Sequence, residues 1–240
     1  MTASENRNRR RERLPRDERV ADIMQAARVV FCDKGYEQAS TAEIAAKAGV
    51  VEGTLYRYFP SKRDLLIKVV EDFYERIFAD YERQLQGVRG TWNRLRFLIW
   101  KHLSVIHGDP QMCRLIMHEL RPWPEYRHSS VSKLNQRYTQ RTLTVVEEGI
   151  ANGELRADAP LRIVRDMIFG CAEHHTWAYL RGEGDFSPDE AADAITNLIY
   201  QGLAHRAPRK SSAVEASVRR LEQAVEKLEG LATPSRKRRA

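Results

Sequence analysis

The chain has 240 residues, and its hydrophobic content of 42% is enough for a packed core, so the composition excludes an intrinsically disordered protein. The length allows one ordinary domain and a small one. The formal net charge of +7 lies at the ends of the chain, because residues 1–19 carry +3, residues 205–240 carry +6, and residues 20–204 carry −2.

The sequence contains no apolar run near the roughly 20 residues that a membrane span requires. Its arginine-rich start also lacks the hydrophobic segment of a secretory signal. We therefore expect a cytoplasmic protein with no membrane partner. The three cysteines, Cys32, Cys113 and Cys171, lie far apart within apolar helical patterns, so we expect buried small side chains. A redox-sensing thiol is the lesser alternative.

Residues 1–16 are expected to form a disordered basic arm, and the next segment is helical. The arm contains five closely spaced arginines, at Arg7, Arg9, Arg10, Arg11 and Arg13. It is suited to contact phosphates or an adjacent minor groove of DNA, although a solvated charge run is the alternative. From about Asp17 to Lys34, apolar residues recur with helical spacing up to Gly35.

Two short helices joined by a glycine turn are predicted next. Ser40 and Glu43 have the spacing of a capping box, and Gly49 supplies the turn. In the second helix the inward residues are expected to be Val50, Leu55 and Phe59, which leaves an outward face that fits the major groove. This is the pattern of a helix-turn-helix.

The sequence continues as Gly-Thr-Leu-Tyr-Arg-Tyr-Phe-Pro-Ser-Lys-Arg-Asp-Leu over residues 53–65, which closely resembles the DNA-binding domain of the tetracycline-repressor (TetR) family. The preceding segment matches too, at Ala26-Ala27, Phe31, Gly35-Tyr36 and Thr41. The resemblance implies an all-α protein, with a three-helix DNA-binding domain at residues 17–63 (the head) and a ligand-binding and dimerisation bundle at residues 64–206 (the body). It implies a sequence-specific transcriptional regulator and no enzyme.

The resemblance also assigns roles in the head. Residues expected to hold the DNA backbone are Thr41, Thr54, Tyr56, Tyr58 and Lys62, because they offer hydroxyl groups or positive charge. Residues expected to read bases are Val51, Glu52, Gly53 and Arg57. Family members often have serine or another small residue where Val51 stands, so the recognition helix lacks a capping hydroxyl here. Leu55, Phe59 and part of Tyr58 are expected in the core.

The body reads as further helices with no strand. A long helix is expected from Ser61, its cap, to about Gln86, followed by helices at about 92–107, 110–120, 128–152, 161–180 and 188–204. The last two carry apolar stripes, one at Leu161, Val164, Ile168, Cys171 and His175 and the other at Ala191, Ile195, Leu198 and Gly202. The resemblance implies that this pair of helices packs against its twin in a homodimer that reads a palindrome.

A body of this size suggests a small-molecule effector. Candidates to line an apolar cavity are Trp100, Trp123, Trp177 and Tyr179. Arg114, His118 and Arg121 follow one helical face that suits an anionic ligand. Residues 117–121 and 167–170, with Glu173, resemble the fatty-acid-degradation branch of the family, which implies an acyl-CoA effector that releases a repressor from DNA. The alternatives are core aromatics and a solvated charged face.

Other functions are less well supported. Glu173, His174 and His175 are adjacent, so their side chains point about 100° apart on a helix, and we expect no metal site. We find no phosphate-binding glycine loop or nucleophile elbow, so no catalytic residue or cofactor is expected. An activator or architectural DNA-binding protein without a ligand response remains the alternative function.

Residues 207–240 form a basic extension. Val214, Val218, Leu221, Val225 and Leu228 alternate steps of four and three, which is coiled-coil spacing. Two heptads are marginal on their own, so the segment either docks elsewhere or forms a partial helix on a flexible tether. The basic run at residues 236–239 is consistent with a solubilising tail or a binding role.

Overall fold

The computed structural model describes residues 16–204 and 212–232. Of the expected basic arm at residues 1–16, residues 1–15 lie outside the described residues, as does the basic run at residues 236–239, whereas Arg16 already belongs to the first described helix. The chain divides into two units, residues 1–204 and residues 205–240, which we describe separately. No helix in the two described ranges is long and apolar enough to cross a membrane.

The head consists of three helices, α2 (Arg16–Gln38), α3 (Thr41–Ala48) and α4 (Glu52–Tyr58). The regular part of α2 ends where the sequence predicts, because Gly35 adopts φ 76° and ψ 171°, which only glycine adopts without strain. Buried residues that include Ile23, Phe31, Ile44 and Leu55 fill the space between the three helices. The predicted helix-turn-helix is confirmed.

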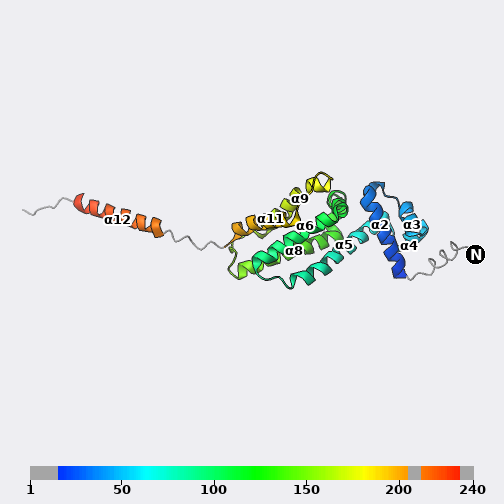
Figure 1. Cartoon of the computed structure of the whole chain (residues 1–240), viewed down its shortest axis with the longest axis horizontal. Coiled ribbons are helices and arrows are strands. Elements are labelled where there is room, and N and C mark those ends of the chain that lie inside the picture. Colours follow the sequence, from blue (N-terminus) through cyan, green and yellow to red (C-terminus); the bar gives the residue numbers. More distant parts are fainter. Residues whose placement is uncertain (1–15, 205–211, 233–240) are drawn as a thin grey trace, which may run out of the picture. The chain divides into compact units, whose positions relative to one another are not determined.

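Helix α5 (Lys62–Leu85) leads from the head into the body (Figure 1). Its predicted cap is present, since the Ser61 hydroxyl accepts the Asp64 N–H at 3.0 Å. Leu65 and Leu66, near its start, are fully buried, and the buried stripe continues to Leu85. Both parts of this unit therefore share α5 and one continuous core.

The body is helical throughout the described residues, as expected, and holds no strand there beyond one isolated antiparallel bridge between Leu155 and Ala204. Its elements after α5 are α6 (Thr91–Gly108), α7 (Pro110–Arg114), η1 (Leu115–Leu120), η2 (Pro124–His128), α8 (Ser130–Ala151), α9 (Leu161–His175), α10 (Trp177–Leu180) and α11 (Pro188–Leu203). Helix α6 packs against α8 and α11, and α5 packs against α8.

Two helices predicted as continuous are interrupted. The segment at residues 110–120 is α-helical only to Arg114 and then π-helical in η1, where the Arg121 N–H binds the Ile116 carbonyl at 3.0 Å. The segment at residues 161–180 breaks at Thr176, whose hydroxyl donates to the Ala172 carbonyl at 2.9 Å. A threonine that binds the carbonyl four residues back competes with the helix ladder and bends it.

The expectation of three buried cysteines is wrong for Cys171. Cys113 is buried and Cys32 is half-buried, and burial raises the pKa of Cys113 to about 12 and that of Cys32 to about 11. These two thiols stay protonated at neutral pH and are poor nucleophiles. Cys171 is exposed, because its position on α9 faces away from the core that Ile168 and Ala172 enter.

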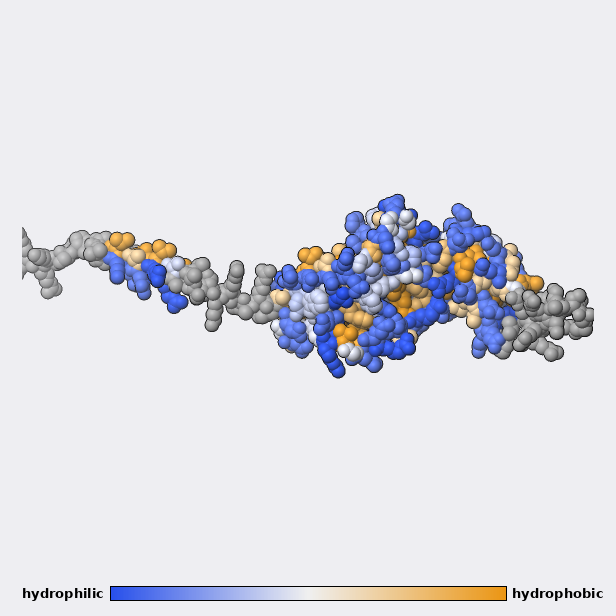
Figure 2. Space-filling view, in the orientation of Figure 1, coloured by the Kyte–Doolittle hydropathy of each residue, from blue (hydrophilic) through white to orange (hydrophobic). Residues whose placement is uncertain are grey.

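The second unit contains α12 (Ser212–Ala232), a single helix that covers the stripe with coiled-coil spacing. Figure 2 shows hydrophobic side chains along one side of α12 and hydrophilic side chains along the other.

Candidate DNA-reading face and effector cavity

The turn between α3 and α4 is built by local capping. The Ser40 hydroxyl accepts the Glu43 N–H at 3.1 Å, and Gly49 adopts the left-handed conformation with φ 68°. The amides of Gly49 and Val50 then bind the carbonyls of Ala46 and Ala45, which closes the helix end. The Glu43 carboxylate binds Lys34 at 2.9 Å, so only half of the expected capping box forms.

Helix α4 is oriented by the inward residues that the sequence predicts. Leu55 is fully buried, Phe59 is 5% exposed, and Val50 packs partly buried against them. The opposite face is open to solvent, with Val51 73% exposed and Tyr56 45% exposed. The other exposed residues on this face are Glu52, Gly53 and Arg57. Val51 provides no side-chain cap, as expected.

A small polar cluster joins α3 and α4 on the exposed face of the head. The Thr41 hydroxyl donates to the Glu52 carboxylate and lies 3.1 Å from the Tyr56 hydroxyl. Thr54 and Tyr58 are half-buried, and the Arg57 guanidinium lies 5.3 Å from the centre of the Tyr58 ring. Three of the predicted contact residues thus hold one another in place before any DNA is bound.

The Lys62 side chain lies against the backbone at the end of α2. Its ammonium donates to the carbonyls of Tyr36 at 2.8 Å, Ala39 at 3.0 Å and Glu37 at 3.4 Å, and it lies 4.4 Å from the centre of the Tyr36 ring. An ammonium has three N–H groups, and all three are directed at these carbonyls. Lys62 thus joins the end of α2 to the start of α5, and its predicted phosphate contact stays a prediction.

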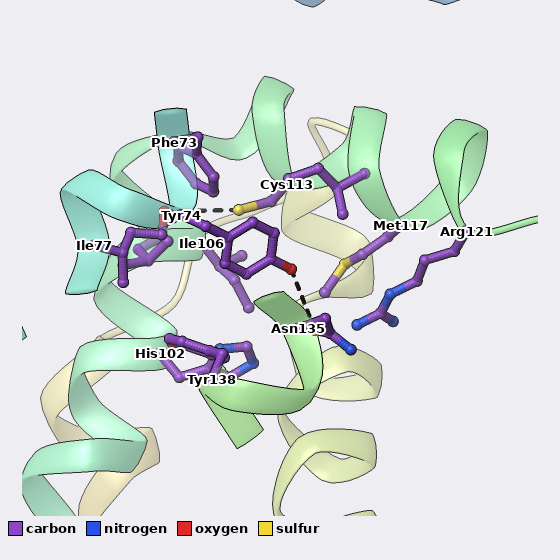
Figure 3. A pocket seen from close by; sticks show the side chains of 12 residues that line it. Phe73, Tyr74, Ile77, His102, Ile106, Cys113, Met117, Arg121, Asn135 and Tyr138 are labelled. Atoms are coloured by element: carbon purple, nitrogen blue, oxygen red, sulfur yellow. Dashed lines mark hydrogen bonds between the residues drawn. The ribbon is translucent and has the colours of Figure 1, made fainter. Parts of the chain in front are cut away.

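The body contains a small apolar cavity of about 40 Å³. Its walls come from α5, α6, α7, η1 and α8, at Phe73, Tyr74, Ile77, His102, Val105, Ile106, Cys113, Ile116, Met117, Arg121, Asn135 and Tyr138. Figure 3 shows the Tyr74 hydroxyl pointing at Asn135, whose side-chain oxygen accepts its hydrogen bond at 3.2 Å. The Arg121 guanidinium also reaches toward Asn135 in this view (Figure 3).

His102 is a neutral polar group within these apolar walls. Its Nδ1 lies 3.1 Å from the Tyr138 hydroxyl. Burial, with a smaller effect of the nearby Arg121 charge, lowers the pKa of His102 from 6.5 to about 4. At neutral pH the cavity therefore holds one cation, Arg121, at its edge.

Only Arg121 of the predicted ligand residues lines this cavity. Its guanidinium binds the Glu173 carboxylate at 3.0 Å. Glu173, His118 and Trp177 line a second, outer cavity of about 360 Å³ between η1 and α9, so the Arg121–Glu173 pair stands between the two cavities.

The other predicted ligand residues lie elsewhere. The Trp100 indole N–H binds Asp189 at 3.2 Å and so connects α6 with α11. Trp123 lies at the junction of head and body, with its ring centre 4.9 Å from the Tyr36 ring centre and 4.4 Å from the Arg63 guanidinium.

Arg114 is exposed. The shared face expected for Arg114, His118 and Arg121 is wrong, because the π-helical turn of η1 adds about one residue and rotates Arg121 away from the others.

Segment α7–η1 contacts the head directly. The Glu119 carboxylate accepts the backbone N–H of Tyr36, and Arg28 of α2 forms an ion pair with Asp109, which caps α7. Cys113, Ile116 and Met117 of the same segment line the cavity. One short segment thus touches both the cavity and the DNA-binding head.

Comparisons with known proteins agree with this architecture. Residues 23–69 match the family profile described as bacterial regulatory proteins, tetR family, and residues 89–203 match the profile of a tetracyclin repressor-like C-terminal domain. FasR, an HTH-type transcriptional activator of Mycolicibacterium smegmatis, is 38% identical over 198 residues that cover 82% of this chain and 89% of FasR. This chain belongs to the tetR family of bacterial regulatory proteins.

Two further tetR-family comparisons concern fatty-acid regulation. The fatty acid metabolism regulator protein of Bacillus subtilis is 25% identical over 181 residues, which cover 75% of this chain and 93% of that protein. The crystal structure of FadR from Bacillus subtilis in complex with stearoyl-CoA has a TM-score of 0.69 and 26% identity, and covers 76% of this chain and 98% of that one. The predicted family and all-α fold are confirmed, and the chain is a transcriptional regulator.

Several tetR-family site residues were not predicted from the sequence. His102, Asn135 and Tyr138 line the cavity from α6 and α8, and no local motif marks them. Gly35 and Tyr36 are part of the family match, but their contact with Glu119 joins residues more than 80 positions apart and carries no local signal. Met117 lies within the segment that resembles the fatty-acid branch.

Proposed function

We propose that this tetR-family regulator is a homodimeric repressor, that its two heads bind a palindromic operator, and that an acyl-CoA bound in the body releases it. The observation that carries the proposal is the position of η1, which lines the cavity with Ile116 and Met117 and binds the head through Glu119. A ligand that enlarges the cavity by displacing η1 acts on the head, because η1 is attached to it through Glu119. DNA binding and dimerisation, the other two steps of the proposal, use other surfaces of the protein.

The DNA-binding step uses the exposed face of α3 and α4. We assign phosphate contacts to Thr41, Thr54, Tyr56 and Tyr58, and base contacts to Val51, Glu52, Gly53 and Arg57. The exposure of Val51 and Tyr56 supports this assignment, as does the polar cluster that fixes Glu52 and Tyr56 in orientation. A thymine methyl group suits the apolar Val51, and the Glu52 carboxylate suits a cytosine amine. Lys62 contributes by holding α2 against α5.

The dimer uses the outer face of α9 and α11, which pack side by side. The expected stripe is partly misplaced, because Val164, Ile168, Ala191 and Ile195 are buried in their own body. The apolar residues left outside lie on the neighbouring face, with Ile163 54%, Met167 53% and Leu198 75% exposed. Gly202, Cys171 and His175 of the expected stripe are also exposed. An exposed apolar patch on two adjacent helices supports an interface between copies.

The effector site combines the two cavities. The inner cavity of about 40 Å³ is far below the roughly 300–1,000 Å³ of ligand pockets, so an acyl chain must displace side chains to enter it. Met117 is suited to this because its unbranched side chain adopts many rotamers. The outer cavity of about 360 Å³ beside Arg121 suits the polar part of the ligand. The acyl chain would then lie in the inner cavity and the CoA phosphates near Arg121.

An activator is the second candidate, and the similarity to the activator FasR favours it. Both candidates share the DNA face and the cavity and differ only in the response of transcription. A reporter gene driven by the operator separates them. Deletion of the regulator gene raises reporter expression if the protein is a repressor and lowers it if the protein is an activator.

Titration with stearoyl-CoA tests the effector directly. We expect it to raise the melting temperature and to release the labelled operator, whereas free CoA, which lacks the chain, has neither effect. Replacing Arg121 by methionine should weaken stearoyl-CoA binding on the order of tenfold, since a hydrogen bond to a charged group contributes about 1.5–3 kcal/mol. Arg114→Met is the matched control, because Arg114 is exposed outside both cavities. Absence of a thermal shift and of operator release with acyl-CoAs of every chain length tested would refute the effector.

A further inference from the structure

Helix α12 has a hydrophobic face with no partner in the described unit of residues 212–232. Its large apolar residues with described side chains are Val218, Leu221, Val225 and Leu228, at 46%, 66%, 51% and 66% exposure. Figure 2 shows hydrophobic residues along one side of the helix and hydrophilic residues along the opposite side. A helix of 21 residues with such a face is a marginal structure alone in water. A partner that covers the face is required for the helix to be stable.

We propose that this partner is α12 of a second copy of the chain, and that the two helices form a parallel two-stranded coiled coil. The inference rests on the homodimer proposed above. The residues themselves select the number of strands. In the heptad register, Val218 and Val225 occupy position a, and Leu221 and Leu228 occupy position d. A β-branched residue at a with leucine at d favours two parallel strands.

The charge pattern selects the parallel orientation over the antiparallel one. Glu222 occupies position e, and glutamate recurs there at positions 215 and 229 of the sequence. In an antiparallel pair the e positions face each other, so that Glu222 would lie against Glu222 of the other copy. In a parallel pair each e position faces a g position, and Ser217 and Ala224 at g are uncharged. The parallel pair therefore avoids repulsion between like charges.

The body dimer explains how so short a coil can form. Seven residues, 205–211, separate α12 from the end of the body unit, and a fully extended segment of that length spans at most about 25 Å. Dimerisation through α9 and α11 thus keeps two copies of α12 within reach of each other. Short tethers give effective concentrations in the millimolar range, which is enough to pair helices that stay apart when free in solution. In return, the coil stabilises the dimer.

Disulfide trapping in the full-length protein tests the proposal. In a Cys171→Ser background, which removes the exposed native thiol, Leu228→Cys places one thiol at position d of each chain. In a parallel coil the two thiols meet and oxidise to a covalent dimer. In an antiparallel coil that keeps the stripe together, Leu228 lies opposite Val218 of the other copy, and the two cysteines are about 15 Å apart, which is too far for a disulfide.

Lys227→Cys in the same background is the matched control, because position 227 lies one residue away on the outward face. We expect cross-linking of Leu228→Cys to be on the order of tenfold faster than that of Lys227→Cys, and Leu221→Lys to remove the difference. If sedimentation shows a dimer but the cross-linking rates of Leu228→Cys and Lys227→Cys are equal, the coiled coil is overturned while the proposed homodimer stands. A monomeric protein would instead refute the proposed homodimer, and the coil with it.

Discussion

The carboxylate of Glu119, in the body, accepts the backbone N–H of Tyr36, in the head. Gly35 makes this approach possible, since a Cβ at that position would lie 2.8 Å from a Glu119 oxygen. The left-handed φ of Gly35 also turns the Tyr36 amide out of the helical ladder of α2. This bond connects η1, which lines the cavity with Ile116 and Met117, to the end of α2 in the head.

We predict that Glu119→Ala uncouples effector binding from DNA release. Loss of an acceptor from a partly buried amide costs about 1–3 kcal/mol, which is comparable to typical allosteric coupling energies. In the wild type, stearoyl-CoA lowers operator affinity by a certain factor. In Glu119→Ala this factor should be on the order of tenfold smaller, while stearoyl-CoA still binds. Glu119→Gln retains an acceptor oxygen and should give an intermediate result. Full release by the alanine variant would exclude Glu119 as the connection.

Lys62 and Arg57 are predicted to affect DNA binding in different ways. Lys62→Ala removes three hydrogen bonds to carbonyls, so the free energy of unfolding should fall by about 1–3 kcal/mol while the salt dependence of operator binding is unchanged. Arg57→Ala removes an exposed charge, so stability should be unchanged and operator affinity should fall. Denaturant unfolding and binding at several salt concentrations test both. A salt slope lowered by about one in Lys62→Ala would restore its phosphate role.

Leu198→Asp is predicted to make the protein monomeric at micromolar concentration, because it places a charge in the centre of the proposed α9–α11 interface. Val29→Asp is the matched control, since Val29 is an exposed apolar residue of the head, at 39% exposure, outside this face. Sedimentation velocity measures the outcome. If both variants remain dimers, the interface lies elsewhere.

His102 is predicted to make stability depend on pH. Its pKa of about 4 in the folded protein lies below the 6.5 of an exposed imidazole, so the unfolded chain binds the proton first as the pH falls. The contribution of the neutral His102 to the free energy of unfolding is therefore complete above pH 6.5 and is lost progressively toward pH 4. At pH 4.5 the loss amounts to about 2–3 kcal/mol relative to pH 7. Between pH 7 and pH 4.5, the free energy of unfolding measured in urea should therefore fall by about 2–3 kcal/mol less in His102→Gln than in the wild type. Identical pH profiles for the two proteins would contradict a buried neutral His102.

Local signals explain why the head could be predicted in detail. Ser40, Gly49 and Ser61 act on backbone groups within five residues of themselves, and each forms the predicted cap or turn. Leu55 and Phe59 are buried as their spacing indicates. The hydrogen bonds of Lys62 could not be predicted, because its partners are the carbonyls of residues 36–39, which come near only when α2 packs against α5.

The body could be predicted only at the level of helices. The π-helical turn at residues 115–120 and the break at Thr176 change which side chains face inward, and neither has a sequence signal that distinguishes it from a regular helix. Arg121 therefore enters the cavity while His118 stays outside. The same limit applies to α9, where Met167 and not Ile168 is left exposed.

Equilibrium binding of the purified protein to a palindromic duplex from the DNA flanking its gene tests the central claim, which is that paired α4 helices read DNA under the control of the body cavity. We predict that two chains bind each duplex, at least about 10³-fold more tightly than random DNA, and that stearoyl-CoA lowers this affinity at least about tenfold. A protein that binds as a monomer, with no preference over random duplex and no response to stearoyl-CoA, would contradict the account.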